Sequence, residues 1–500
     1  MVITIDYMLA IKLDKGKIII ETDDRSVQFY LQGTVEETGY NFYLKRMDLM
    51  KKTVKIYDKS KTVRGVTTYT IGRGWLAYIM NMFKDHISKE TYDYLYRSLL
   101  SDSYVDTPFP NLRNYQNSDI LHLLKYKVGL FQVAVGLGKS EMIATLTNYF
   151  RSIGKRVLLI CPGSKARDEL DKRVNIRFGL TPTSVIGDPL CSIITSGLMN
   201  RKDLKKDVEL EKKLGSYDVV LVDEVEYTIN PGGMFLYDRL QNAEYFYGFS
   251  GTADKYTGQA LTFREGLSEN ILRNKDLIKY FGPALVYRLP TNKQISQIVV
   301  KTKSLDFLKL DMPRTGGKTN IYNEVMNQIW TDPKICRCIV KICKAYPQTF
   351  IPMNNLTTVI TEWIEKWFKG VFRVLLVCGE GYLYYDLDGK MTNLNLTQAC
   401  EYIREGLVDV IPSTSAGYRA LDFPGLENIL LCIGKVAGVV IQALGRCSRG
   451  EHMNIITMEP YGESRKIPVL SKAMEERETL FSEYYKYCMF DKTIMGEDAL

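Results

Sequence analysis

The sequence predicts an α/β protein in which two tandem parallel-sheet lobes follow a small α+β region. From about residue 106, apolar runs typical of buried strands alternate with amphipathic helical stretches, and a second series of the same kind starts near residue 291. This alternation is typical of a parallel sheet covered by helices on both faces. The first 80 residues instead hold short runs rich in β-branched and aromatic residues. We therefore expect three domains, at 1–105, 106–290 and 291–500.

The N-terminal region should form a sheet followed by helices. Its strand-like runs are separated by charged or glycine-bearing turns and lie at 3–13, 17–22, 41–47, 53–58 and 65–71. Helical spacing of apolar residues then extends from Trp75 to Leu100. The following stretch, 101–114, carries two prolines and several polar residues, as a linker does. The first domain boundary is therefore placed near residue 105.

The two lobes are predicted from two series of apolar runs. In the first lobe a helix at 140–154 accompanies strand-like runs at 129–135, 156–161, 218–224 and 245–251. In the second lobe helices at 356–368 and 397–406 accompany runs at 348–353, 372–378, 407–413, 427–433 and 453–459. Residues 472–490 have the pattern of an amphipathic helix that packs on the second lobe.

Composition and charge restrict the class of protein. Of the 500 residues, 45% are hydrophobic and 25% charged, which is typical of globular proteins and excludes a largely disordered chain. Lys and Arg exceed Asp and Glu by 66 to 58, so the net charge of +8 favours a polyanionic partner such as nucleic acid. No segment approaches the roughly 20 consecutive apolar residues that span a bilayer, and the first residues do not read as a signal peptide. These features predict a cytoplasmic protein.

The ten cysteines and three histidines disfavour several kinds of site. Because the cysteines form no pair of CxxC knuckles, we expect buried free thiols in a reducing compartment rather than a zinc site. Three histidines in the whole chain also disfavour a His-rich metal centre or a Ser/His/Asp triad.

A glycine-bearing turn, AVGLGKS, ends at Ser140 and is the strongest local signal. Because it lies between an apolar run and a helix, its backbone N–H groups can surround phosphates at the start of that helix. Lys139 would reach the β- and γ-phosphates, Ser140 would bind magnesium, and Gly136 and Gly138 would line the nucleotide. Val133 stands where the full Walker A pattern begins with glycine, so a structural strand–helix turn with an incidental lysine is the alternative.

An acidic pair, Asp223 and Glu224, follows the hydrophobic run DVVLV. One carboxylate at the end of a strand can hold magnesium, and the next can polarise the attacking water. We assign the first role to Asp223 and the second to Glu224. Acidic pairs at strand ends are often only solvated, so the assignment of these roles depends on the presence of the turn at Lys139 in the same sequence.

A third segment, QALGRCSRG, has Gln442, Arg446 and Arg449 four and three residues apart on one face of a predicted helix. A guanidinium group is always charged and forks onto phosphate oxygens, as stabilisation of a transferring phosphoryl group requires. An ordinary surface helix is the alternative. Gly445 argues against it, because a glycine inside a helix costs about 1 kcal/mol relative to alanine and usually has a packing reason.

In this order the segments resemble the motifs of superfamily 2 nucleic-acid helicases and translocases, over roughly residues 110–460. AVGLGKS is similar to motif I, VDEVE to motif II and QALGRCSRG to motif VI. LRNYQ resembles the family's Q-type motif, LLICPGSKARDEL motif Ia, IITSG motif Ib, GFSGTA motif III and TSAGYRALDFPG motif V. FGPALVYRL resembles the segment that commonly closes the first lobe.

The resemblance implies two RecA-like lobes with ATP and Mg²⁺ between them, and ATP hydrolysis that moves the lobes. It assigns catalytic roles to Lys139, Asp223, Glu224, Gln442, Arg446 and Arg449, and magnesium to Ser140 and Asp223. Further nucleotide contacts are implied for Arg113, Gln116 and Asp422. Motif III implies that Ser250 and Thr252 link hydrolysis to movement.

A nucleic-acid strand lying across both lobes would be gripped through its phosphates, without regard to sequence. The strand contacts that the resemblance implies are Gly163, Thr195, Asn354 and Thr414. Two positions depart from the family pattern: Glu226 replaces the His or Asp of many relatives in motif II, and Ala420 replaces a frequent glycine in motif V. Because Glu226 departs from the family pattern, the sequence does not predict whether motif II contacts motif III.

The N-terminal region carries a basic run. Between Lys45 and Arg73 nine basic residues stand against two acidic ones, with Tyr57 and Tyr69 interleaved. Such a run suits a nucleic-acid backbone, with a solvated sheet face as the alternative. The candidate DNA contacts are Lys52, Lys55, Lys61, Arg64 and Arg73. Residues 52–79 also resemble the N-terminal domain of phage UvsW-type helicases, which remodel branched DNA.

We therefore expect an ATP-dependent DNA helicase that reverses forks and migrates Holliday junctions during phage recombination, repair and replication. Its partners would be forked or four-way DNA and recombination or replication proteins of the same phage, in the cytoplasm of the host. An RNA helicase or a general duplex-unwinding helicase is the alternative enzyme, because the core motifs do not separate DNA from RNA. A non-catalytic DNA-binding scaffold is the alternative from another class, with Val133 and Glu226 in its favour.

Overall fold

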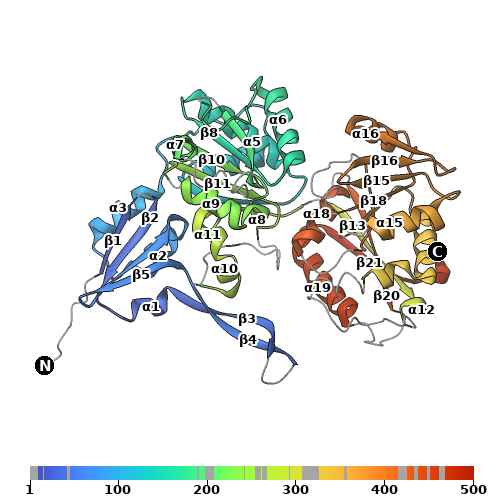
Figure 1. Cartoon of the computed structure of the whole chain (residues 1–500), viewed down its shortest axis with the longest axis horizontal. Coiled ribbons are helices and arrows are strands. Elements are labelled where there is room, and N and C mark those ends of the chain that lie inside the picture. The colour runs from blue at the N-terminus through green and yellow to red at the C-terminus, as the bar shows by residue number, and fades with distance from the viewer. Residues whose placement is uncertain are drawn as a thin grey trace. The chain divides into compact units, whose positions relative to one another are not determined.

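The structure is a computed structural model (Figure 1). It describes residues 9–14, 16–41, 46–188, 191–197, 208–240, 242–253, 261, 267–291, 293–306, 326–353, 357–414, 425–432, 437–447, 451–460 and 468–500. The described residues form two compact units, one reaching Arg288 and the other starting at Leu289, and the short segment Ala134–Leu137 groups with the second.

The first unit begins with an antiparallel sheet in the order β1-β2-β6-β5. Its strands are β1 (Leu9–Asp14), β2 (Lys17–Thr22), β5 (Tyr57–Val63) and β6 (Val66–Gly72). A separate hairpin pairs β3 (Gln32–Asn41) with β4 (Arg46–Lys55). The helices of this region are α1 (Val27–Tyr30), α2 (Leu76–Phe83) and α3 (Lys89–Leu99). Alternating burial along β2 explains why this apolar run forms a strand with one face on the core.

The N-terminal sheet packs directly on the rest of the first unit. One hydrophobic core includes Ile18 and Trp75 of this region together with Phe281, far along the chain. The backbones meet closely, because a Cβ atom added to Gly74 would lie 1.9 Å from the carbonyl oxygen of Ile278. The change of sheet near residue 105 therefore falls inside one compact unit.

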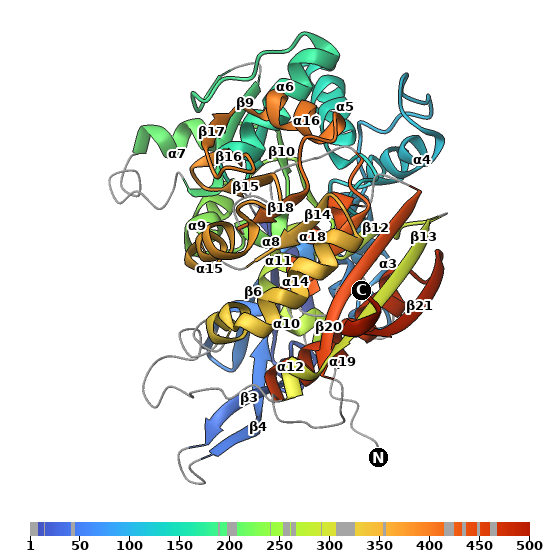
Figure 2. The same cartoon turned by 90° about the vertical axis from the view of Figure 1, so that its right-hand side faces the viewer.

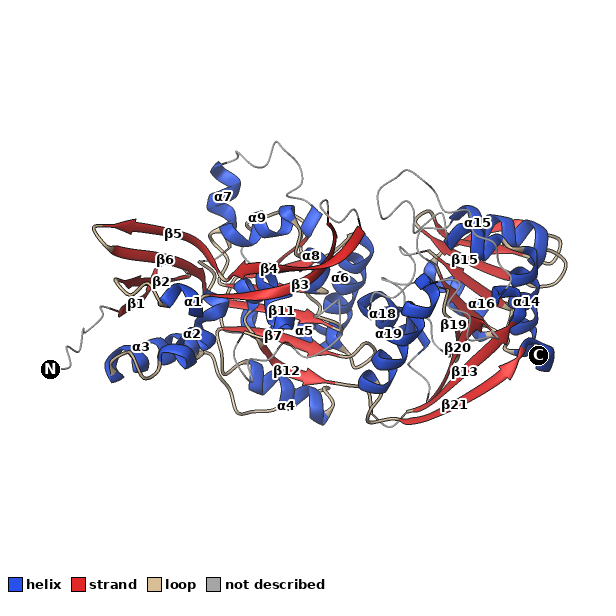
Figure 3. Cartoon of the chain, turned by 90° about the horizontal axis from the view of Figure 1, so that it is seen from below, coloured by secondary structure: helices blue, strands red, loops and turns tan. Residues whose placement is uncertain are grey.

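The larger sheet of the first unit is six-stranded and fully parallel, in the order β12-β7-β11-β10-β8-β9. Figure 3 shows β12, β7 and β11 side by side. Its strands are β7 (Val128–Val133), β8 (Val157–Cys161), β9 (Cys191–Thr195), β10 (Val219–Val222), β11 (Tyr245–Ser250) and β12 (Ala284–Arg288). The helices are α4 (Asn114–Leu123), α5 (Lys139–Ser152), α6 (Ser164–Phe178), α7 (Val208–Leu214), α8 (Val225–Thr228), α9 (Pro231–Arg239), α10 (Glu269–Arg273) and α11 (Lys275–Phe281). The predicted parallel-sheet lobe is confirmed.

The second unit holds a nine-stranded sheet in the order β17-β16-β15-β18-β14-β19-β20-β13-β21. Its strands are β13 (Gln294–Thr302), β14 (Thr349–Pro352), β15 (Val374–Cys378), β16 (Gly381–Tyr385), β17 (Met391–Leu394), β18 (Val410–Ser413), β19 (Asn428–Leu430), β20 (His452–Pro460) and β21 (Met489–Gly496). Its helices are α12 (Lys303–Asp306), α14 (Pro333–Ala345), α15 (Thr357–Trp363), α16 (Leu396–Arg404), α18 (Ala437–Cys447) and α19 (Pro468–Tyr484). The second predicted lobe is confirmed, and β16 is its one antiparallel strand among the described residues, paired with β15 on one side and β17 on the other.

Four strands of this sheet lie outside the predicted runs. β13 and β21 pair in parallel, and β13 also pairs with β20 (Figure 2). β16 and β17 form a hairpin after β15. The helix expected over 472–490 ends at Tyr484, and β21 follows from Met489. The buried side chains of Leu480, Phe481 and Tyr484 pack α19 into the core of this unit.

The ten cysteines are free thiols, eight of them buried. In the part of the chain that the structure describes, no helix has the length and apolar character needed to cross a bilayer.

Candidate nucleotide site

The loops that carry the sequence motifs of the first unit meet at one edge of its parallel sheet. Lys139 follows β7, Gly163 follows β8, Thr195 ends β9, and Asp223 follows β10. Ser250 ends β11. Because all these strands are parallel, their carboxyl ends lie at the same edge, which is where ligands bind in open α/β sheets.

The turn between β7 and α5 has the backbone that its glycines allow. Gly136 and Gly138 have φ angles of 85° and 83°, in the left-handed region that favours glycine. The Leu137 N–H donates to the Ala134 carbonyl oxygen at 3.3 Å, which closes the turn. Gly138 also lies against Gln116, since an added Cβ would be 2.3 Å from Nε2 of Gln116. The start of α5 therefore presents its first N–H groups beside an amide side chain.

Lys139 is buried and forms an ion pair with Glu224. Its Nζ lies 3.1 Å from Oε1 of Glu224, and the two side chains are 8% and 18% exposed. Burial lowers the pKa of Lys139, but Glu224, Asp223 and Glu226 together raise that pKa by more. The structure thus brings the predicted lysine and the predicted acidic pair together, with the ammonium group kept protonated.

The acidic segment places three carboxyl groups, those of Asp223, Glu224 and Glu226, around the single ammonium group of Lys139. Burial raises the pKa of Asp223 to about 7, Glu224 acts in the same direction, and Lys139 opposes them. The Glu224 N–H donates to Oδ1 of Asp223 at 3.0 Å. Glu224 itself has a φ of 45°, which is uncommon for a residue with a side chain. Strained backbone of this kind clusters at functional sites.

Glu226 connects the acidic segment to the end of β11. The Ser250 hydroxyl donates to Oε2 of Glu226 at 2.6 Å, and the Thr252 hydroxyl donates to Oε1 at 3.2 Å. The Thr252 N–H in turn donates to the Ser250 hydroxyl oxygen at 2.8 Å. Burial and the charge of Glu224 hold the pKa of Glu226 well above its ordinary value. The contact between these two motifs, left unpredicted by the sequence, is therefore present.

Gln116 and Arg113 form the start of α4. The Arg113 N–H donates to Oε1 of Gln116 at 2.9 Å, so this amide caps the helix while its other end meets Gly138. Sequence reasoning missed Asp119 on the same helix, whose carboxylate accepts two 2.6 Å hydrogen bonds from the guanidinium of Arg288 on β12. Arg288 belongs to the segment FGPALVYRL that the motif comparison singled out, whereas Asp119 lies three residues after LRNYQ, and the pairing depends on the fold.

The two candidate nucleic-acid contacts of the first unit, Gly163 and Thr195, lie at the ends of the neighbouring β-strands β8 and β9. Thr195 pairs in register with Cys161 at the end of β8. Gly163 follows two residues later, and no atom lies within 4 Å of a Cβ added there. In the second unit Thr414 is buried after β18 and donates its N–H to the Val377 carbonyl oxygen at 3.0 Å. Asn354 lies outside the described residues.

The arginine-bearing segment belongs to the second unit. Gln442 is buried on α18, and the backbone of Arg446 belongs to the same helix. Arg449 and Asp422 lie outside the described residues. The predicted roles of these four residues stay predictions.

Most of the basic residues of the N-terminal region are exposed. Lys52 and Lys55 lie on β4, Lys61 on β5 and Arg64 in the turn that follows. Of the two interleaved tyrosines, Tyr69 is buried, with its ring 5.0 Å from that of Tyr57. Tyr69 therefore belongs to the sheet core rather than to a surface that could stack on bases.

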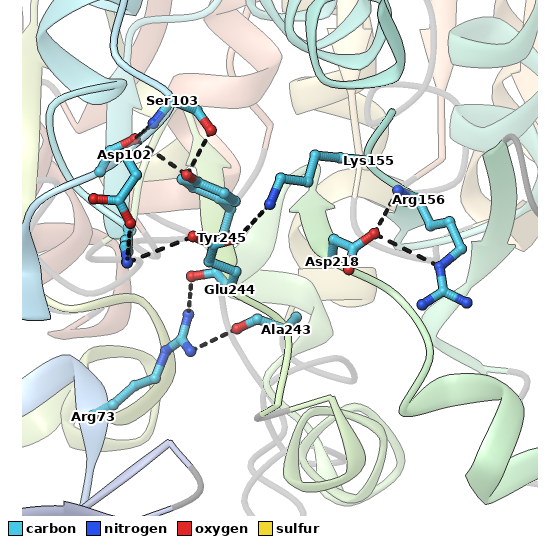
Figure 4. A network of polar contacts seen from close by, with 11 residues as sticks. Arg73, Asp102, Ser103, Lys155, Arg156, Asp218, Ala243, Glu244 and Tyr245 are labelled. Carbon is cyan, nitrogen blue, oxygen red and sulfur yellow. Dashed lines mark hydrogen bonds and ion pairs between the residues drawn. The ribbon is translucent and has the colours of Figure 1, made fainter. Parts of the chain in front are cut away.

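Arg73 has a different environment from the other basic residues (Figure 4). Its guanidinium donates to the carbonyl oxygens of Ala243 at 2.7 Å and Glu244 at 3.2 Å. Burial lowers the pKa of Arg73 to about 10, although Tyr247 and Glu244 act in the opposite direction. Because the side chain is committed to the start of β11, we expect it to anchor the N-terminal sheet rather than to contact DNA.

Comparisons with known proteins identify likenesses of fold. No family model matches the chain, and no curated protein matches it. The structure of T4 UvsW aligns over 98% of this chain and 99% of its own, with a TM-score of 0.37 and 12% identity. S. cerevisiae Dbp5 bound to RNA and ADP BeF3 aligns over 83% of this chain and 96% of its own, with a TM-score of 0.48 and 11% identity. A variant of S. cerevisiae Dbp5 bound to a Gle1 variant and IP6 aligns over 77% of this chain and 90% of its own, with a TM-score of 0.46 and 13% identity. At these identities the likeness concerns the fold alone.

Proposed function

We propose that the chain is an ATP-dependent superfamily 2 helicase or translocase that remodels branched DNA. The observation that carries the proposal is the cluster at the carboxyl edge of the first-unit sheet, where Lys139 and Glu224 meet at 3.1 Å beside Asp223. A buried lysine at the start of a helix, next to two strand-end carboxylates, is the arrangement that phosphoryl transfer from a nucleotide requires.

The residues present fit ATP with Mg²⁺. The glycine turn leaves the first N–H groups of α5 for phosphate oxygens, and Lys139 adds a positive charge. A divalent cation would favour the ionised form of Asp223, whose pKa burial and Glu224 raise to about 7. In the described part of the chain no three acidic, Cys or His side chains converge on a metal position. Magnesium would be held by Ser140, Asp223 and phosphate oxygens of the nucleotide.

The chain's own residues would have separate tasks. When bound, ATP would supply the phosphoryl group that is transferred, and magnesium would neutralise part of the negative charge on the phosphates. Lys139 would turn from Glu224 to the phosphates, which would free the Glu224 carboxylate to accept a proton from the attacking water. Gln442, Arg446 and Arg449 are proposed to stabilise the transferring phosphoryl group. Arg113, Gln116 and Asp422 are proposed to bind the rest of the nucleotide.

The DNA assignment rests on the basic N-terminal strands. Lys52, Lys55, Lys61 and Arg64 are exposed on or beside β4 and β5, and exposed cations on strands suit a phosphate backbone. We propose that residues 1–105 hold duplex DNA near a junction while 106–290 and 291–500 act as the motor. Phage recombination and repair would be the setting, in the host cytoplasm. An RNA or general duplex-unwinding helicase is the second candidate.

The test is ATP hydrolysis by wild type and Glu224→Gln, without nucleic acid and with single-stranded, forked and four-way DNA and matching RNA. Glu209→Gln, at an exposed glutamate of α7, is the matched control. Stimulation by branched DNA that disappears only in Glu224→Gln is the expected result. Stimulation chiefly by RNA would move the assignment to the second candidate. Absence of hydrolysis with every nucleic acid would contradict both and favour a scaffold.

A further inference from the structure

A carboxylate stands in the first turn of the helix that would receive the nucleotide phosphates. Glu141 is the third residue of α5, directly after Lys139 and Ser140. Its side chain is 18% exposed. The side chain lies beside the glycine turn, because a Cβ added at Gly138 would be 4.0 Å from Cγ of Glu141.

A negative charge at this position favours the helix but opposes an anionic ligand. The N-terminus of a helix carries partial positive charge, so an acidic residue there stabilises the helix. The same charge repels phosphate groups that approach the same N–H groups, and partly buried charges so close together are screened little by salt. A free Glu141 carboxylate would therefore weaken nucleotide binding.

Two arginines of the neighbouring helix cover both oxygens of this carboxylate. Arg173 of α6 donates to Oε1 of Glu141, and Nε of Arg177 lies 2.8 Å from Oε2. The two arginines are four residues apart and thus lie on one face of α6. The three side chains together carry one net positive charge where Glu141 alone would carry one negative charge.

We propose that Arg173 and Arg177 are positioning residues for nucleotide binding, which hold the Glu141 carboxylate against α6 and reverse the local charge beside the phosphate turn. This inference rests on the proposed function, because it needs a nucleotide at Lys139. A purely structural ion pair between α5 and α6 would give a different result. Removing either partner would then have the same effect on nucleotide affinity, whereas in our proposal loss of the arginines lowers that affinity only while Glu141 is present.

The experiment measures the Kd of mant-ATP by fluorescence titration. The variants are Glu141→Gln, the pair Arg173→Gln/Arg177→Gln, and the triple variant that combines them. Arg156→Gln is the matched control, since Arg156 pairs with Asp218 at the start of β8 in the same unit (Figure 4). We expect the arginine pair to raise Kd about tenfold, which is about 1.4 kcal/mol. Glu141→Gln should stay within about twofold of wild type, and the triple variant should recover most of the loss.

Thermal melting of each variant separates binding from folding. If the glutamine pair melts early, Arg173→Lys/Arg177→Lys keeps the charge with less geometric demand, and we expect its Kd to stay within about threefold of wild type. A loss in Glu141→Gln equal to that of the arginine pair, or no recovery in the triple variant, overturns the inference and leaves the proposed function intact. Absence of mant-ATP binding by folded wild type would remove the proposed function, and this inference with it.

Discussion

Ser250 at the end of β11 donates a 2.6 Å hydrogen bond to the buried carboxylate of Glu226, which follows β10. β10 and β11 are neighbours in the parallel sheet, so the contact joins two loops of the candidate site. Thr252 adds a second donor to the same carboxylate. Burial raises the pKa of Glu226, and the hydrogen bond from the Ser250 hydroxyl lowers it. The ionisation of Glu226 therefore depends on its hydrogen-bond donors. Glu226 therefore adds a side-chain contact between the acidic segment and the end of β11 to the backbone pairing of β10 with β11.

Replacement of Ser250 by alanine should weaken this link. Removing one hydrogen-bond partner of a buried polar group costs about 1 to 3 kcal/mol, so the midpoint of urea denaturation should fall. We expect basal ATP hydrolysis to persist and its stimulation by nucleic acid to decrease, because Lys139 and Glu224 are not altered. Ser216→Ala removes an exposed hydroxyl hydrogen bond on the same unit and is the control. Unchanged stability together with unchanged stimulation would contradict this role.

The parallel sheets were predictable because several of their inner strands are apolar and buried. All residues of β8, β10 and β11 are buried, and such strands appear in the sequence as continuous hydrophobic runs. The turn at Lys139 and the acidic pair at Asp223 follow two of these runs, so the common edge could be inferred. The contact of Glu226 with Ser250 was not predictable in the same way, since it requires the sheet order that sets β10 beside β11.

The elements that escaped prediction lack a clear pattern or depend on distant partners. Most of β21 is exposed on both faces, so its sequence shows no alternation, and its pairing partner β13 lies almost 200 residues earlier. Arg73 illustrates a similar limit for charge. A count of basic residues includes it with Lys61 and Arg64, but only the fold determines that its side chain points to the carbonyl oxygens of Ala243 and Glu244.

Arg73→Met should destabilise the junction between the N-terminal sheet and the parallel sheet. The substitution keeps much of the side-chain volume but removes the donors to two carbonyl oxygens, and we expect a loss of about 3 kcal/mol in the free energy of unfolding. Limited proteolysis within 101–114 should accelerate. Arg64→Met, at an exposed arginine nearby, should leave stability unchanged. If Arg73→Met instead keeps its stability and lowers DNA affinity, the anchoring role is wrong.

The second unit should lose stability at low pH through Asp409. Burial raises the pKa of this carboxyl group, but two hydrogen bonds from the Arg373 side chain, at 2.7 and 3.0 Å, and one from its backbone outweigh burial, so the net shift is downward. A carboxyl group with a lowered pKa stabilises the fold above its unfolded pKa of about 3.9, and the contribution disappears as the pH falls through the lower folded pKa.

Asp409→Asn therefore tests the pH dependence directly. We expect it to unfold more easily than wild type by about 1 to 2 kcal/mol at pH 7, with the difference shrinking as the pH falls below about 4. Urea denaturation at a series of pH values measures both quantities. Asp388→Asn, at an exposed aspartate of the same unit, should show no such pH-dependent difference. A constant difference across the whole series would rule out a contribution from the ionised carboxylate.

The basic strands should determine how steeply DNA binding depends on salt. Each cation that neutralises a phosphate contributes about 0.9 to the slope of log affinity against log salt on B-DNA. Replacing Lys52, Lys55, Lys61 and Arg64 by glutamine should reduce that slope by about 0.9 for each side chain that pairs with a phosphate, with equal effects on unrelated sequences. The control replaces four exposed lysines of the second unit, Lys334, Lys344, Lys369 and Lys390. Because both variants lose the same net charge, an equal reduction in the two slopes would mean that overall charge, and not these strands, binds the DNA.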